Sequence, residues 1–101
     1  MSDLKFEYHS EAIIEAHEAY HWYASKSEEV ADRFWLRLQS RRIAVTRNPA
    51  VWTPYLRGTR CVLLRPFPYG LVFVERADTI VGVAVAHLHR RPGYWRGRLE
   101  D

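Results

Sequence analysis

The segment from Thr79 to Trp95 constrains the fold more than any other stretch of the chain. Its first half, residues 79–86, is a run of small and β-branched apolar residues, which is typical of a strand buried on both faces. The second half contains two histidines, two arginines and the pair Pro92-Gly93. Arginines are costly to bury unpaired, and a Pro-Gly pair does not continue a β-ladder. We therefore expect a rigid strand that delivers a cationic and aromatic cluster to the surface.

The length and composition indicate one small globular domain over residues 1–101. A hydrophobic content of 48% excludes a disordered chain, and 27% charged residues without a long apolar run exclude a membrane span. No basic-then-apolar leader is present, so we expect a cytoplasmic protein. The lone Cys61 allows no internal disulfide and is expected in the core. All but two of the 15 basic residues are arginines, which favours planar contacts with carboxylate or phosphate.

Periodicity predicts a strand and a helical hairpin in the first half of the chain. Alternate residues from Leu4 to Tyr8 are apolar, as in a half-buried strand at a sheet edge. Apolar residues then recur at helical spacing over residues 10–25, with Ser10 as the N-cap, and again from Ser27 toward Asn48. The short link between the two patterns predicts an antiparallel helical hairpin.

The second predicted helix carries a basic stripe formed by Arg33, Arg37 and Arg41 at intervals of four residues. We interpret this stripe as a solvated helix face, with a binding surface as the alternative.

Three apolar runs follow a loop over residues 48–58. They predict strands at residues 61–64, 71–74 and 80–86, joined by connections short enough for antiparallel hairpins. The predicted fold class is therefore α+β in the order β-α-α-β-β-β, with one helical hairpin packed on one twisted antiparallel sheet.

One motif on the first predicted helix suggests a metal site. The sequence His17-Glu18-Ala19-Tyr20-His21 matches the zinc-protease pattern H-E-x-x-H, in which two histidines share the metal and the glutamate acts as general base. No downstream motif supplies the third protein ligand that catalytic zinc requires. We therefore interpret the two histidines as surface or hairpin-packing residues, and we expect no metal or other cofactor. A zinc hydrolase is a remote alternative.

The cluster after the last strand, together with Arg57, Arg60 and Arg65, suggests a binding site. Arginine forks fit phosphate oxygens, and Tyr94 or Trp95 could stack on an RNA base. The same residue types are equally suited to acidic side chains of a protein partner. A third interpretation is that the aromatic residues and His87 close over the sheet edge while the arginines are solvated.

Several short motifs occur in a characteristic order along nearly the whole chain. They are Glu15-Ala16, Trp22-Tyr23-Ala24, Arg33-Phe34, Phe67-Pro68-Tyr69, Ala84-Val85-Ala86-His87 and Arg91-Pro92-Gly93-Tyr94-Trp95. With this order and spacing the chain resembles the RelE/ParE superfamily, the toxins of bacterial type II toxin–antitoxin modules, which include plasmid-stabilisation proteins. The resemblance implies a RelE-like fold, growth inhibition, and a cognate antitoxin, encoded by an adjacent gene, that folds on binding.

The resemblance implies one of two activities. RelE-like members look like metal-independent mRNA endonucleases that act on the ribosome, whereas ParE-like members poison DNA gyrase. The nuclease branch usually has an arginine after the strand tyrosine, where this chain has Gly70 after Tyr69, and no lysine follows Lys26. Gyrase inhibition is therefore slightly favoured, with mRNA cleavage or a non-toxic binding partner as alternatives. The candidate catalytic residues are Arg60, His87 and Tyr94, and the candidate target-binding residues are Arg65, His89, Arg90, Arg91 and Trp95.

Overall fold

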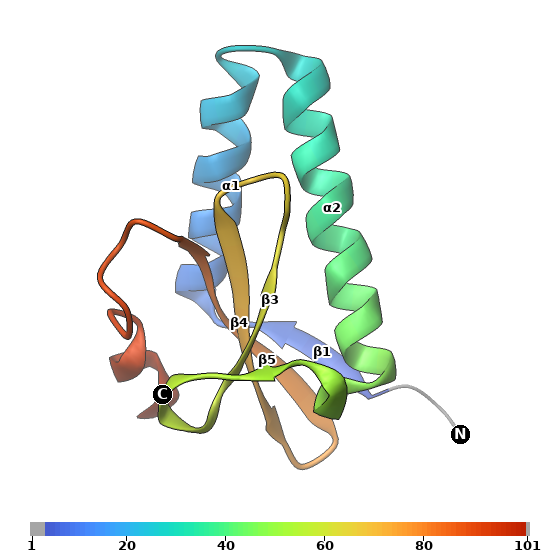
Figure 1. Ribbon diagram of the computed structural model, residues 1–101, viewed down its shortest axis with the longest axis vertical. Coiled ribbons are helices and arrows are strands. Elements are labelled where there is room, and N and C mark those ends of the chain that lie inside the picture. The colour runs from blue at the N-terminus through green and yellow to red at the C-terminus, as the bar shows by residue number, and fades with distance from the viewer. Residues whose placement is uncertain (1–3, 101) are drawn as a thin grey trace.

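Figure 1 shows the computed structural model, which describes residues 4–100. The helices and strands are β1 (Lys5–Tyr8), α1 (Ser10–Ala24), α2 (Glu28–Arg47), β2 (Thr53–Pro54), β3 (Arg60–Leu63), β4 (Tyr69–Arg76) and β5 (Thr79–His87). Short 3-10 turns are η1 (Pro49–Val51), η2 (Leu56–Gly58) and η3 (Arg96–Glu100). The predicted order of elements is confirmed, with the two-residue β2 added inside the predicted loop. Within residues 4–100, no helix combines the length and the apolarity needed to cross a membrane.

The sheet has five strands in the order β1-β5-β4-β3-β2. As predicted, β1 lies at an edge. It pairs in parallel with β5, so the prediction of an antiparallel sheet was wrong for β1, whereas every other pair of strands is antiparallel as predicted. No tight turn joins β1 to β5, and residue alternation alone does not fix the direction of an edge strand. The sheet is therefore mixed.

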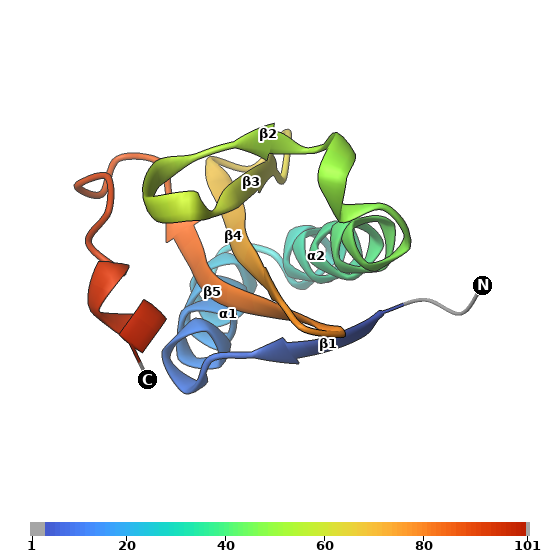
Figure 2. The same cartoon turned by 90° about the horizontal axis from the view of Figure 1, so that it is seen from below.

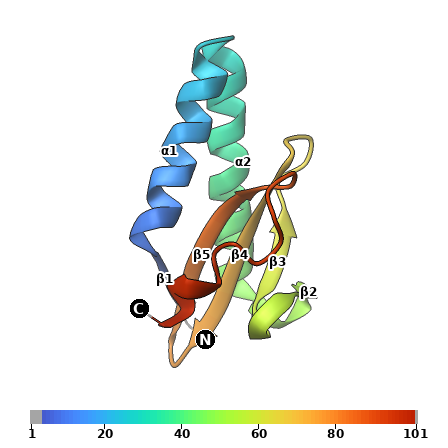
Figure 3. The ribbon, with the colours of Figure 1, turned by 90° about the vertical axis from the view of Figure 1, so that its left-hand side faces the viewer.

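The two helices cover one face of the sheet (Figure 2). Small residues of α1, namely Ala16 and Ala19, let the helix approach a core that contains Phe34 and Leu38 of α2. The opposite face carries a second cluster, in which Val72 and the β5 residues Val83 and Ala84 pack against Trp95. Figure 3 shows the segment after β5 folding back across the strands to reach this position. The C-terminal segment thus acts as a third layer.

Local interactions explain the start of each helix. The Nδ1 atom of His9 accepts a hydrogen bond from the backbone N–H of Glu11 at 3.1 Å, so His9, not the predicted Ser10, is the N-cap of α1. Ser10 is instead the first residue of the helix. The predicted cap of α2 is confirmed, because Ser27 Oγ accepts from the N–H of Val30 at 3.3 Å.

Candidate functional site

The strand β5 is longer than its neighbour β1, and its free edge is completed by side chains. β1 pairs only with Thr79–Gly82. Beyond that point, Glu15 of α1 accepts a hydrogen bond from the N–H of Val85 at 3.0 Å, and Arg98 donates to the carbonyl of Val83 at 3.0 Å. Arg98 also donates two hydrogen bonds to the Glu15 carboxylate, at 2.9 and 3.0 Å. An ion pair therefore takes the place of a missing strand.

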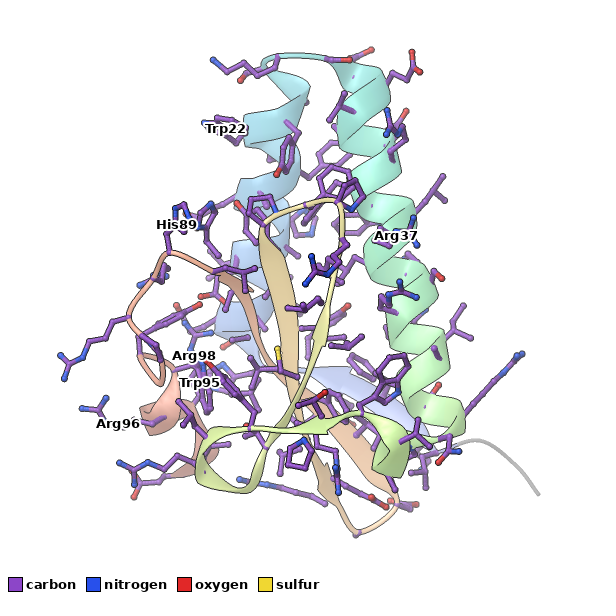
Figure 4. All side chains as sticks on the ribbon, viewed as in Figure 1. Trp22, Arg37, His89, Trp95, Arg96 and Arg98 are labelled. Carbon is purple, nitrogen blue, oxygen red and sulfur yellow. The ribbon has the colours of Figure 1, made fainter. Side chains whose placement is uncertain are left out.

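Two further side chains converge on the same carboxylate. The Tyr94 hydroxyl donates to Glu15 Oε2, and an Arg90 nitrogen lies 3.5 Å from that oxygen. The Arg90 guanidinium also lies 3.7 Å from the centre of the Tyr94 ring, as in a cation–π contact. We call Glu15, Arg90, Tyr94 and Arg98 the Glu15 cluster. In Figure 4, Arg98 lies against the strands near Trp95, whereas Arg96 points away from the protein.

The Glu15 cluster limits what Tyr94 can do chemically. Burial, followed by the hydrogen bond to Glu15, raises the pKa of Tyr94 well above its usual range. Tyr94 therefore stays protonated at neutral pH, and its one proton is donated to Glu15. As a general acid or base for a bound substrate, Tyr94 would first have to leave this hydrogen bond.

His87 lies in a shallow groove between α1 and the end of β5. The groove has a volume of about 260 Å³ and is lined by Glu15, Glu18, Ala19, Trp22, Tyr69, Val85, His87 and Arg90. The His87 ring packs edge-on against Tyr69, with 5.0 Å between ring centres, and its Nδ1 accepts from the N–H of His89 at 3.1 Å. Because Nδ1 is an acceptor, neutral His87 carries its proton on Nε2. It can donate a hydrogen bond from Nε2, whereas Nδ1 is already used as an acceptor within the protein.

The third catalytic candidate, Arg60, lies elsewhere. Its guanidinium donates to the carbonyl of Trp52 at 2.7 Å. Arg60 is opposite Phe73 on β4, whereas His87 is opposite Tyr69 on the same strand. Phe73 and Tyr69 are four residues apart, which corresponds to roughly 13 Å along the strand. Arg60 and His87 are therefore far apart in the strand direction. The structure does not bring the three predicted catalytic residues into one site.

The predicted target-binding residues divide into two groups. Arg65, His89, Arg90 and Arg91 are exposed. Trp95 is only 1% exposed and packs in the second core cluster, so its assignment to a target-binding surface was wrong. A large apolar ring that covers the outer face of the sheet stabilises the fold by removing that surface from water.

Gly70, which follows Tyr69 on β4, lies on the outer face of the sheet. A Cβ atom built on Gly70 would lie 2.9 Å from Cys61 Sγ and 3.7 Å from Leu88 Cδ2. The space beside Gly70 is therefore filled by Cys61 and Leu88. Cys61 is partly buried, and burial raises the pKa of its thiol. A longer side chain at position 70 would require Cys61 to move.

The two histidines of the H-E-x-x-H motif lie on the exposed side of α1. The His17 ring lies 5.4 Å from the Trp35 ring of α2 and 6.5 Å from that of His21. Among residues 4–100, no group of three His, Cys, Asp or Glu side chains is arranged to hold a metal ion. Both histidines are exposed and His17 contacts the second helix, so the interpretation as surface or hairpin-packing residues is confirmed.

Sequence reasoning missed the central residues of the site, Glu15 and Arg98. One signal was present for Glu15, because it lies between the buried Ala12 and Ala16 and close to the inner face of the helix. A carboxylate at such a position requires a partner. Nothing local identified that partner as Arg98.

Two helices lie on one face of a five-stranded mixed sheet, and the C-terminal segment lies on the other face. Among solved structures, a chain of the chromosomal ParDE toxin–antitoxin system from P. aeruginosa superposes with a TM-score of 0.75. The match covers 85% of this chain and 97% of that chain at 12% sequence identity. No family model and no curated protein sequence matches this chain. The RelE-like fold that the resemblance implied is thus confirmed.

Proposed function

We propose that this chain is the toxin of a type II toxin–antitoxin module and is neutralised by an antitoxin encoded by an adjacent gene. The observation that carries the proposal is the likeness, over 85% of this chain, to a chain of the ParDE system. The net charge of +3 supports it, because it is complementary to an acidic antitoxin segment.

The toxic act that we propose is inhibition of a replication enzyme such as DNA gyrase. Cleavage of RNA through the 2′-hydroxyl needs a group that takes up a proton and a cation at the phosphate. The acceptor nitrogen of His87 and the hydroxyl proton of Tyr94 are both used inside the protein. Gly70 offers no cation, and the space beside it is filled by Cys61. Loss of one well-placed donor typically slows such chemistry by a factor of roughly 10²–10³.

Expression in a bacterial host tests the proposal. Induction without the adjacent gene should arrest growth, and co-expression with that gene should restore it. Unimpaired growth after induction would instead indicate a non-toxic binding partner.

Two assays then separate the activities. We expect the purified protein to inhibit supercoiling by gyrase, and primer extension on cellular mRNA to show no new ends after induction. Discrete cleavage within codons, abolished by His87→Ala, together with unaffected supercoiling, would reverse the assignment to a ribosome-dependent endonuclease.

A further inference from the structure

A polar pocket lies where the 3-10 turn η2 meets the C-terminal segment. The pocket has a volume of about 790 Å³, and the residues that line it include Arg57, Arg91, Tyr94, Arg96, Leu99 and Glu100. We call it the arginine pocket. Three guanidinium groups against one carboxylate leave an excess of two positive charges. A concave surface with such an excess attracts anions.

Packing holds the two sides of the arginine pocket in place. Beside η2, the backbone N–H of Tyr55 donates to the carbonyl of Thr59 at 2.8 Å, and the Tyr55 ring lies 6.0 Å from the ring of buried Trp95. On the other side, the Tyr94 hydroxyl donates to Glu15. The pocket is therefore preformed, so a ligand does not have to order its walls on binding.

Arg57 has a backbone conformation that favours glycine. Its φ of 60° and ψ of 34° lie in the left-handed region, which residues with a bulky side chain rarely adopt. Gly58 follows it, yet position 57 itself is an arginine. Strained residues of this kind cluster at ligand-binding sites. Because the fold alone would favour glycine at position 57, the arginine side chain points to a role in binding.

The guanidinium groups of Arg57 and Arg91 are available to a ligand. Both residues are exposed, and neither side chain forms a hydrogen bond or ion pair with another residue in the range 4–100. Arg96 donates to the carbonyl of Gly93 at 3.3 Å and points away from the protein (Figure 4). Arginine forks match the oxygens of phosphate groups, so the pocket is suited to a ligand with several phosphates.

We propose that the arginine pocket binds consecutive phosphate groups of duplex DNA. The inference rests on the proposed function, because it gives the toxin a direct contact with the DNA on which the replication enzyme acts. Cations alone are sufficient to bind the backbone of a DNA duplex. Single-stranded RNA is instead bound with its bases stacked on aromatic rings.

Tyr94, the aromatic residue that lines the arginine pocket, is not free for such stacking. The Arg90 guanidinium already lies 3.7 Å from the centre of the Tyr94 ring, and the neighbouring Trp95 is buried. An acidic peptide would pair with the arginines, but its apolar side chains would find little apolar surface, because Leu99 packs against the second core cluster. The pocket therefore favours a phosphate backbone over RNA bases or a peptide.

The test measures the binding of a short, fluorescently labelled DNA duplex to the purified full chain by anisotropy at several salt concentrations. The pocket variants are Arg57→Gly alone and Arg57→Gly with Arg91→Ala. The matched control, Arg33→Ala with Arg37→Ala, removes the same number of charges from the stripe on α2. Thermal melts establish that each variant is folded. Single-stranded RNA, inorganic pyrophosphate and an oligoglutamate peptide are tested as competing ligands.

We expect Arg57→Gly to melt no lower than the wild type, because glycine relieves the left-handed backbone, and yet to bind the duplex more weakly. The double pocket variant should bind about tenfold more weakly at low salt. Its slope of log K against log salt concentration should be smaller by about 1.8, as expected for two lost phosphate contacts. The matched control should bind within about threefold of the wild type.

An equal loss of binding in the double pocket variant and the matched control would overturn the inference, because it would reflect net charge and not the pocket. Tighter binding of RNA, pyrophosphate or oligoglutamate than of the duplex, lost in the same pocket variants, would also overturn the assignment to DNA. If the wild type inhibits gyrase but binds no duplex, this inference fails and the proposed function stands. If the wild type binds DNA through the pocket but neither arrests growth nor inhibits gyrase, the proposed function fails.

Discussion

Replacing Glu15 by alanine should destabilise the protein strongly, because one carboxylate holds α1, β5 and the C-terminal segment together. The side chains of Glu15 and Arg98 are only 10% and 15% exposed. Removing one partner of a buried ion pair typically costs about 3–5 kcal/mol, since the other charge is left without compensation. The N–H of Val85 also loses its acceptor. Because Arg98 keeps some solvent exposure, we expect the free energy of unfolding to fall by about 3 kcal/mol, the lower end of this range.

Urea unfolding followed by circular dichroism and tryptophan fluorescence measures this change. The matched control is Glu18→Ala, which removes an exposed carboxylate from the next turn of the same helix and should stay within about 0.5 kcal/mol of the wild type. The double replacement of Glu15 by Leu and Arg98 by Met removes both charges, and we expect it to recover much of the loss. In Glu15→Ala, the fluorescence of buried Trp95 should shift toward that of exposed indole at lower urea concentrations.

Equal unfolding free energies for Glu15→Ala and Glu18→Ala would refute this reasoning. They would mean that the ion pair is already solvated and that Trp95 alone holds the C-terminal segment on the sheet. A double replacement as unstable as Glu15→Ala would show that the lost stability comes from packing and not from the uncompensated charge.

Three other predictions can be tested with purified protein or in cells. Gly70→Ala should lower stability by about 1–3 kcal/mol through overpacking against the Cys61 thiol, and Cys61→Ala in the same chain should relieve most of that loss in urea melts. Burial raises the pKa of Tyr8 from 10.0 to about 12, so the folded state holds this proton more tightly than the unfolded state. The resulting stabilisation is present below pH 10 and is lost as the pH rises toward 12. Unfolding free energies measured at alkaline pH should therefore fall less steeply with pH in Tyr8→Phe than in the wild type. Replacing Arg90 and Arg91 by alanine should change stability by only about 0–1 kcal/mol yet strongly reduce growth inhibition on induction, and a folded variant that remains fully toxic would contradict this.

The elements of the fold could be predicted from the sequence because their signals are local. The spacing of Ala12, Ala16 and Ala19 marks the inner face of α1, and Ser27 marks the start of α2 through a bond to a residue three positions away. The apolar run of β5 predicts a buried strand wherever it lies in the chain. The order of these elements and motifs was sufficient to indicate the RelE/ParE-type fold.

The tertiary structure decided how distant segments meet. Glu15 and Arg98 are 83 residues apart in the sequence, and only the fold of the whole chain brings them to the free edge of β5. The parallel direction of β1 and the burial of Trp95 likewise depend on contacts with strands remote in sequence. Periodicity reports which face of an element is apolar, but not which element will cover that face. The arginines and aromatic residues of the C-terminal segment were therefore recognisable from the sequence, whereas their division into core, ion pair and exposed surface was set by packing.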